Sequence, residues 1–125
     1  MSLATESREL IVAALSGNGY KVYDTVPATP ITPSVVCIPD SPWIRPNRLG
    51  SNLNYEIRWR ILVNINARVN DSAIKATEDA IDTLLEALPN TVLVEVINAP
   101  QLLSIGAQGT VMSTEINVTM QMKVG

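Results

Sequence analysis

The alternation of hydrophobic and polar residues is strongest between Asn54 and Val69. The even-numbered positions, one parity of the alternation, are polar apart from Leu62 and include Arg58, Arg60 and Arg68. The odd-numbered positions, the other parity, are apolar: Tyr55, Ile57, Trp59, Ile61, Val63, Ile65, Ala67 and Val69. Successive side chains of a strand point to opposite faces, so the pattern predicts a strand with one apolar and one polar face. Its length, roughly 15 residues, is about three times that of a usual strand.

A second stretch with the same alternation, Met112–Val124, predicts another long two-faced strand at the C-terminus. Three shorter runs rich in β-branched and aromatic residues predict strands at Tyr20–Tyr23, Ser34–Ile38 and Thr91–Ile97. The first two of these lie so close in sequence that we expect them to pair with each other.

Two segments have the helical period instead. The first is Thr5–Ser16, with Thr5 as the expected N-cap and Gly17-Asn18-Gly19 as the stop. Its expected apolar stripe is Leu3, Leu10, Ile11, Ala14 and Leu15. The second runs from a cap at Asn70 or Asp71 to about Leu88, before Pro89. Its expected stripe is Ile74, Thr77, Ile81, Leu84, Leu85 and Leu88.

Two stretches broken by proline or glycine, Asp40–Asn52 and Ala99–Thr110, are expected to be loops. Trp43 in the first of them either folds back over the core or, together with Arg45 and Arg48, forms a docking loop, since Trp and Arg are enriched at interface hot spots. Leu102 and Leu103 make the second stretch unusually apolar. It therefore either covers the core or meets a partner.

The element order α-β-β-β-α-β-β predicts a single α+β domain over residues 1–125. Two helices are expected on one face of a twisted, mostly antiparallel sheet of about five strands. A chain of 125 residues is long enough to bury roughly two thirds of its unfolded surface. The core must be filled by Ile, Val, Leu and Met, because the chain contains no Phe.

The composition argues against several classes of function. The formal net charge of −3 does not fit a domain that grips nucleic acid through its phosphates. No secretory signal and no apolar run of about 20 residues is present, and a single cysteine excludes an internal disulfide. We therefore expect an intracellular protein that does not bind membranes.

Residue chemistry predicts no enzyme, no cofactor and no metal site. The chain has no His, which removes the commonest general base and metal ligand. Cys37 lies between Val36 and Ile38 and is expected in the core. The acidic face of the second helix, with Glu78, Asp79, Asp82 and Glu86, has the composition of a solvated face; a divalent cation is the alternative.

The charge distribution is uneven. Five of the nine cations are Arg45, Arg48, Arg58, Arg60 and Arg68, whereas the second helix carries mainly acids. In a two-layer domain the polar sheet face and the outer helix face point in opposite directions, so these groups would pair between copies, as in a head-to-tail ring. The alternative is ordinary surface charge, in which each pair contributes about 0–1 kcal/mol.

The whole layout resembles the tail terminator (tail completion) proteins of long-tailed bacteriophages. The resemblance is carried by the helix that ends at Ser16-Gly17-Asn18-Gly19-Tyr20, the Pro-flanked strand 32–38, the long strand closing at Asn66-Ala67-Arg68, the helix Ser72–Leu88 that follows it directly, and the alternating C-terminal strand. It covers nearly the whole chain and lies in element order and hydrophobic pattern.

This resemblance implies a structural virion protein that forms a hexameric ring at the junction of tail and neck. The ring would cap the tail tube, bind the major tail tube protein and a head-completion protein, and let DNA pass without holding it. Assembly would take place in the host cytoplasm. Interface residues would be Trp43, Arg45, Arg48, Arg58, Arg60, Arg68, Asp79, Asp82, Glu86, Leu102 and Leu103. The alternatives are another neck or tube component and, more distantly, a ligand-binding or enzymatic domain.

Overall fold

The computed structural model describes residues 2–23, 33–49, 52–66, 70–104 and 110–123, with the side chains of these residues except 47–49, 52–54, 70–71, 103–104, 110 and 123. The elements are α1 (Leu3–Leu15), β1 (Lys21–Tyr23), β2 (Ser34–Leu49), β3 (Asn52–Asn66), α2 (Asn70–Ala87), β4 (Val92–Ile97), β5 (Gln101–Ser104) and β6 (Thr110–Lys123). The predicted α+β class and the order of its helices and main strands are confirmed, and β5 is an additional short strand.

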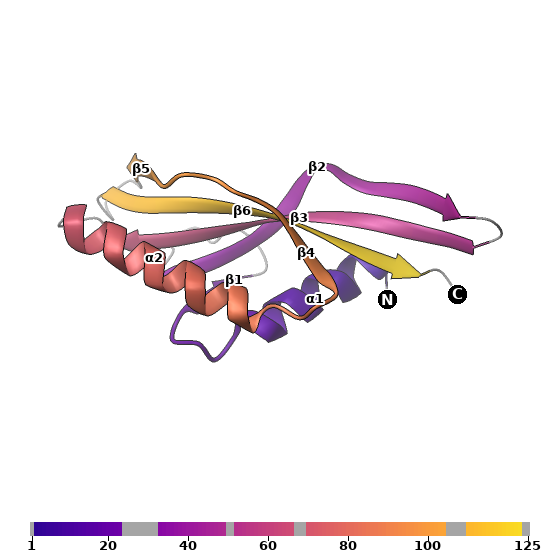
Figure 1. Cartoon of the computed structure of the whole chain (residues 1–125), viewed down its shortest axis with the longest axis horizontal. Helices are drawn as coiled ribbons and strands as arrows, with labels where there is room; N and C mark the ends of the chain where they lie inside the picture. The colour runs from indigo at the N-terminus through magenta and orange to yellow at the C-terminus, as the bar shows by residue number, and fades with distance from the viewer. Residues whose placement is uncertain (1, 24–32, 50–51, 67–69, 105–109, 124–125) are drawn as a thin grey trace.

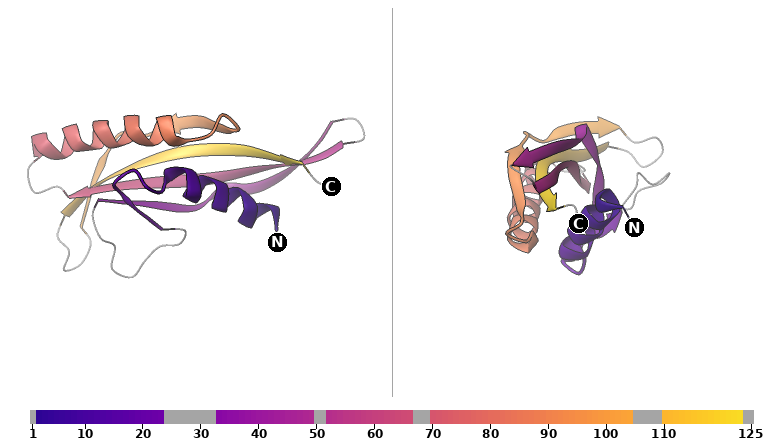
Figure 2. Two further views of the ribbon diagram at one scale, coloured as in Figure 1. Left: turned by 90° about the horizontal axis from the view of Figure 1, so that it is seen from below. Right: turned by 90° about the vertical axis from the view of Figure 1, so that its right-hand side faces the viewer.

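The six strands form one sheet in the order β1-β2-β3-β6-β4, with β5 also paired to β6. Every pairing is antiparallel except that of β1 with β2, in which Val22 lies opposite Val35. The expected pairing of these two neighbouring strands is therefore confirmed. The long strands β2, β3 and β6 run side by side along the molecule, and both helices lie on one side of them (Figures 1 and 2).

The core lies between the helices and the apolar parity of the two longest predicted strands. Ile57, Trp59 and Ile61 of β3 are buried, and so are their partners Met120, Val118 and Ile116 on β6. Burial of each such side chain contributes about 1.5–3 kcal/mol. Over the described residues, the predicted apolar faces of both strands are confirmed as the core, whereas Ala67, Val69 and Val124 lie outside the described part of the chain.

Helix α1 begins two residues earlier than expected. Its N-cap is Ser2, whose hydroxyl oxygen accepts a hydrogen bond from the Thr5 backbone amide at 3.1 Å. The prediction of Thr5 as the cap was therefore wrong, because Ser2 caps equally well and the earlier start lets Leu3 pack against the core. Leu10 was also wrongly placed in the stripe, since this residue is 50% exposed.

The predicted stop of α1 is confirmed. Gly17 and Gly19 have positive φ angles of 83° and 88°, which glycine adopts without strain. The Asn18 amide donates a hydrogen bond to the Leu15 carbonyl at 2.9 Å and so satisfies one of the free acceptors at the helix end.

Helix α2 buries Thr77 and Leu84 of the expected stripe, and Ile81 and the following Leu88 pack against the core, but the packed face is rotated from the one expected. Its buried residues are Ala73, Thr77, Ala80 and Leu84, whereas Ile74 is 44% exposed. The alanines let the helix backbone approach the sheet closely, so the packed face is rotated toward small residues and Ile74 is left at the edge. Neither described helix has the length and apolar character needed to cross a membrane.

The expected loop Asp40–Asn52 is wrong over its described residues, because β2 continues to Leu49 and pairs with β3 from Asn52; residues 50–51 lie outside the described part of the chain. The register shifts between Pro39 and Ile44, and pairing then resumes from Ile44 with Ile57 to Leu49 with Asn52. Among the described strands, β1 pairs only with residues 34–36 of β2, so within the described sheet the later part of β2 is an edge. An edge tolerates the three prolines of β2, Pro39, Pro42 and Pro46, which lack the backbone N–H that a central strand needs.

The expected loop Ala99–Thr110 is likewise wrong in part. Residues 101–104 form β5, which pairs antiparallel with residues 110–113 of β6. Residues 105–109 lie outside the described part of the chain. Apolar residues in this segment therefore belong to a strand at the sheet edge, beside β4 along the same side of β6.

Candidate functional site

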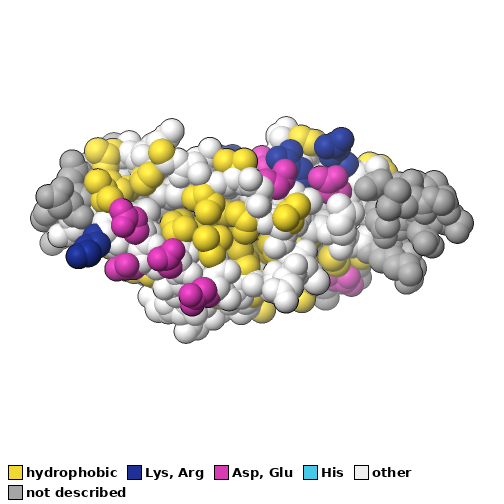
Figure 3. Space-filling view, viewed as in Figure 1, with side chains coloured by type: hydrophobic (Ala, Val, Ile, Leu, Met, Phe, Trp, Pro, Cys, Tyr) yellow, Lys and Arg dark blue, Asp and Glu magenta, His cyan; other side chains and the backbone are white. Residues whose placement is uncertain are grey.

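The helix side of the sheet presents an acidic surface beside exposed hydrophobic residues. Along α2, the side chains of Glu78, Asp79, Asp82 and Glu86 are exposed. Figure 3 shows acidic groups over α2 next to hydrophobic side chains in the middle of this face. The predicted acidic helix face is thus confirmed as exposed. Within the described ranges, no three His, Cys, Asp or Glu side chains lie close enough to hold a metal ion.

A hollow of about 430 Å³ opens between α2 and the segment that joins β4 to β5. Its α2 wall carries Ile74, Ile81, Glu78 and Asp82, and its lining on the opposite side includes Ile97 and Pro100. Thr114 also lines it: this residue is 2% exposed, and its hydroxyl has no hydrogen-bond partner among the described residues. Leu102, in the same β4–β5 region, is 54% exposed, and the side chain of Leu103 is not among those described.

The edge segment of β2 is the second exposed apolar feature. Trp43 is 41% exposed but lies edge-on against the buried Trp59, with 5.7 Å between ring centroids. Ile44 is 39% exposed, and Arg45 is exposed opposite Glu56 in the register. No described acid forms an ion pair with Arg45. Both interpretations of Trp43 thus retain support, since it covers a core residue and also faces solvent.

The opposite side of the sheet carries a connected group of polar side chains from four strands. Arg58 lies at its centre and donates from Nε to Glu95 Oε1 at 3.0 Å. The same guanidinium is 3.4 Å from Asp40 Oδ2. Glu95 reaches this face by alternation, because Leu93, two residues earlier, lies opposite Thr119, which in turn lies opposite Arg58.

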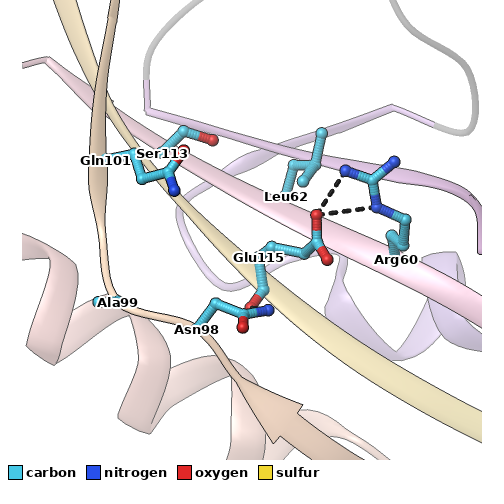
Figure 4. A pocket seen from close by; sticks show the side chains of 7 residues that line it. All are labelled: Arg60, Leu62, Asn98, Ala99, Gln101, Ser113 and Glu115. Carbon is cyan, nitrogen blue, oxygen red and sulfur yellow. Dashed lines mark hydrogen bonds and ion pairs between the residues drawn. The ribbon is translucent and has the colours of Figure 1, made fainter.

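Arg60 lies one step along the same face of β3 and pairs with Glu115 of β6 (Figure 4). The distance from Arg60 Nε to Glu115 Oε1 is 2.8 Å, and Arg60 Nη2 donates to the same oxygen. Asn117 then links the two arginine sites, because its amide donates to Glu115 Oε2 at 3.1 Å and to Asp40 Oδ2 at 2.9 Å. A hollow of about 490 Å³ beside Arg60 and Glu115 reaches Asn98 and Gln101 (Figure 4).

These pairs correct the expected charge distribution. Arg58 and Arg60 were expected to lack acidic partners within the molecule, but the sheet supplies Asp40, Glu95 and Glu115. The cluster carries more carboxylates than guanidinium groups, so it is not a cationic patch. The remaining predicted cations, Arg48 and Arg68, cannot be assigned to a face: the side chain of Arg48 and the whole of Arg68 lie outside what the structure describes.

Sequence reasoning missed the acidic partners of these arginines. Glu115 and Asn117 were recognisable as members of the polar parity of the C-terminal strand, but only the register places Asn117 opposite Arg60. Asp40 was assigned to a loop, and the pairing of β4 with β6 that brings Glu95 beside Arg58 could not be read from the sequence. Cys37 was placed correctly, since it is buried in β2. The interface roles predicted for the exposed residues remain predictions.

The Glu95 carboxylate makes part of the fold's stability dependent on pH. The Thr119 hydroxyl and then Arg58 donate hydrogen bonds to it, and together they lower the pKa of Glu95 below its ordinary value of 4.5. A lowered folded-state pKa stabilises the fold above the unfolded value, and this contribution is lost as the pH falls. We expect the difference in unfolding free energy between the protein and Glu95→Gln to be constant above about pH 5.5 and to shrink below about pH 4.5.

Urea unfolding followed by circular dichroism from pH 3 to pH 7 measures this difference. Thr119→Val is the matched variant, because it removes the larger of the two stabilising hydrogen bonds and leaves Glu95 in place. It should reduce the acid-dependent part of the difference. A difference that stays constant down to pH 3 would show that Glu95 is not held in this way.

Comparison with known proteins identifies the fold but no family. No family model matches the chain, and no curated protein matches its sequence. Solved structures do match, and one is a chain from the virion of a native gene transfer agent particle. The match has a TM-score of 0.51 and 12% sequence identity, and it covers 97% of this chain and 92% of that chain. At this identity, the likeness shows that the two chains share a fold over nearly their whole length.

Proposed function

We propose that this chain is a structural virion protein that forms a ring at the tail-neck junction of a long-tailed phage or phage-like particle. In this role it caps the tail tube and joins it to the head-completion protein. The observation that carries the proposal is the whole-length fold likeness to a virion chain, found independently of the sequence resemblance to tail terminator proteins. The absence of His from the chain fits a role without catalysis.

The charge arrangement supports a ring that lets DNA through. Arg58 and Arg60 are engaged by carboxylates on their own face, so neither guanidinium is free to neutralise a phosphate. Tight binding to DNA needs several such contacts, each of which releases counterions. With a net charge of −3, the protein offers little electrostatic attraction that would slow a passing duplex.

The test is the state of assembly of the purified protein. We expect sedimentation or light scattering to give the mass of a closed oligomer, with six copies as the expected number, and negative-stain images to show single rings. Added tail tube protein should acquire one ring at the end of each tube. A monodisperse monomer that forms no rings, even with tube protein present, would contradict the proposal.

The form of the assembly separates the alternatives. A terminator ring blocks further growth, so the images should show single rings or capped ends. Rings that stack on themselves into long tubes would identify a tube subunit instead. Rings that bind only the head side would identify a head-tail joining protein.

A further inference from the structure

The hollow beside α2 has two walls of different chemistry. Its α2 wall carries Glu78 and Asp82, whose carboxylates are exposed and have no ion-pair partner among the described residues. The segment on its other side is apolar and includes Ile97 and Pro100. Thr114 lines the hollow with a hydroxyl that is buried and unpartnered. Buried polar groups are normally hydrogen-bonded, so this hydroxyl indicates a missing partner.

The edge segment of β2, residues 43–46, has the complementary chemistry. It combines exposed apolar side chains, Trp43 and Ile44, with the exposed cation Arg45. In the register Ile44 lies opposite Ile57 and Arg45 lies opposite Glu56, so the two side chains point to opposite faces of the strand. A strand lying between the two walls of the hollow would turn its cation toward one wall and its isoleucine toward the other.

We infer that the hollow binds the edge segment 43–46 of a second copy of this chain. Arg45 of the incoming copy lies between Glu78 and Asp82, and Ile44 packs against Ile97 and Pro100. Opposite charges meet on the α2 wall and apolar surfaces meet on the other, which favours this occupant over a neutral or acidic one. The inference rests on the proposed function, since it names the contact that closes the ring.

The two halves of this contact lie far apart within one molecule. Ile44 is opposite Ile57, and Thr114 is opposite Val63, six residues further along β3, which is about 20 Å of strand. Figure 1 shows the hairpin of β2 and β3 at one end of the molecule and the start of α2 at the other. The segment therefore cannot reach its own hollow, and each copy uses one surface to bind a neighbour and another to be bound. This is the heterologous geometry that generates rings.

Cysteine cross-linking tests the contact. The double variant Ile44→Cys/Ile97→Cys places one thiol on the segment and one on the wall of the hollow that Ile44 contacts. A disulfide needs Cα atoms within about 7 Å of each other, so under mild oxidation it can form only between copies. We expect a ladder of covalent oligomers on a non-reducing gel, ending at the ring. A mixture of the two single variants should give a dimer of one with the other, and the parent protein, which has only buried Cys37, should give none.

Charge exchange is the second measurement. Arg45→Glu and Asp82→Arg should each raise the concentration for half-assembly about tenfold or more, since like charges then face each other. The double variant with both changes should recover most of the loss. Lys21→Glu is the matched control, because Lys21 is an exposed cation on β1, outside the segment, and its reversal should leave assembly unchanged.

The outcomes separate this inference from the proposed function. Rings that form normally but give no ladder and do not respond to the charge reversals would overturn the inference and leave the ring intact. Charge reversals that affect only the binding of tube or neck protein would also overturn it, because the hollow would then serve a different virion protein. Failure of the parent protein to form rings would instead contradict the proposed function itself.

Discussion

Replacing Trp59 with alanine should lower the free energy of unfolding by about 3–5 kcal/mol, the usual cost of removing a large buried aromatic side chain. Trp59 is 1% exposed at the centre of the core. Its indole nitrogen donates a hydrogen bond to Ser7 Oγ at 2.9 Å and so ties β3 to α1. The Arg8 guanidinium lies 6.0 Å from the Trp59 ring and Trp43 meets the ring edge-on, so several contacts depend on this one side chain.

Two variants divide this loss into its parts. Trp59→Phe keeps most of the apolar volume but removes the indole donor, and the missing hydrogen bond should account for about 0.5–1.5 kcal/mol of its loss. Trp43→Ala removes the edge-on contact and should cost about 1 kcal/mol. Urea unfolding followed by tryptophan fluorescence or circular dichroism measures all three. Equal losses for Trp43→Ala and Trp59→Ala would contradict the placement of Trp59 as the buried member of the pair.

Leu84→Ala should be the most destabilising change in α2, at about 2–5 kcal/mol. Leu84 is fully buried and belongs to the core cluster that joins the helices to β3 and β6. Its removal leaves a cavity that the rigid sheet beneath cannot fill. Thermal or urea unfolding gives the loss directly.

Ile74→Ala is the control within the same helix. Ile74 was expected in the core stripe, but it is 44% exposed and lines the hollow, so its truncation should cost only about 0.5 kcal/mol of stability. An assembly assay separates Ile74→Ala from Leu84→Ala in a second way. Ile74→Ala should weaken ring assembly with the fold intact. Equal effects on stability would show that Ile74 lies in the core, as the sequence predicted.

The longest stretches of regular alternation gave the most reliable predictions of the fold. Residues 54–66 alternate without interruption except at Leu62, and β3 places its apolar parity in the core. Such a pattern is informative because a shift by one residue would expose every apolar side chain. The two loop predictions were wrong because they depended on tertiary position, which a local pattern does not show. Proline argues against a central strand, and no local signal shows that a segment will lie at an edge.

The candidate site was predictable only in part. That Arg58 and Arg60 share one face follows from the two-residue period of a strand. The acidic outer face of α2 follows from the helical period. Which acids meet the arginines depends on the register of β3 with β6 and of β4 with β6, and both are set by contacts between segments that are distant in sequence. A count of charges along the chain therefore suggested free cations where the folded sheet has ion pairs.

The sequence by itself determined that the chain folds as an α+β domain, that β3 and β6 each have one buried face, and that α2 is acidic on its outside. These properties follow from side-chain periodicity, which is local. Only the tertiary structure decided that Arg58 and Arg60 are neutralised within the molecule and that β2 has an exposed edge carrying Arg45. It also decided that a hollow with an unpartnered Thr114 opens beside α2. These features arise where separate strands and helices are brought together, and the energy that fixes them comes from packing across the sheet.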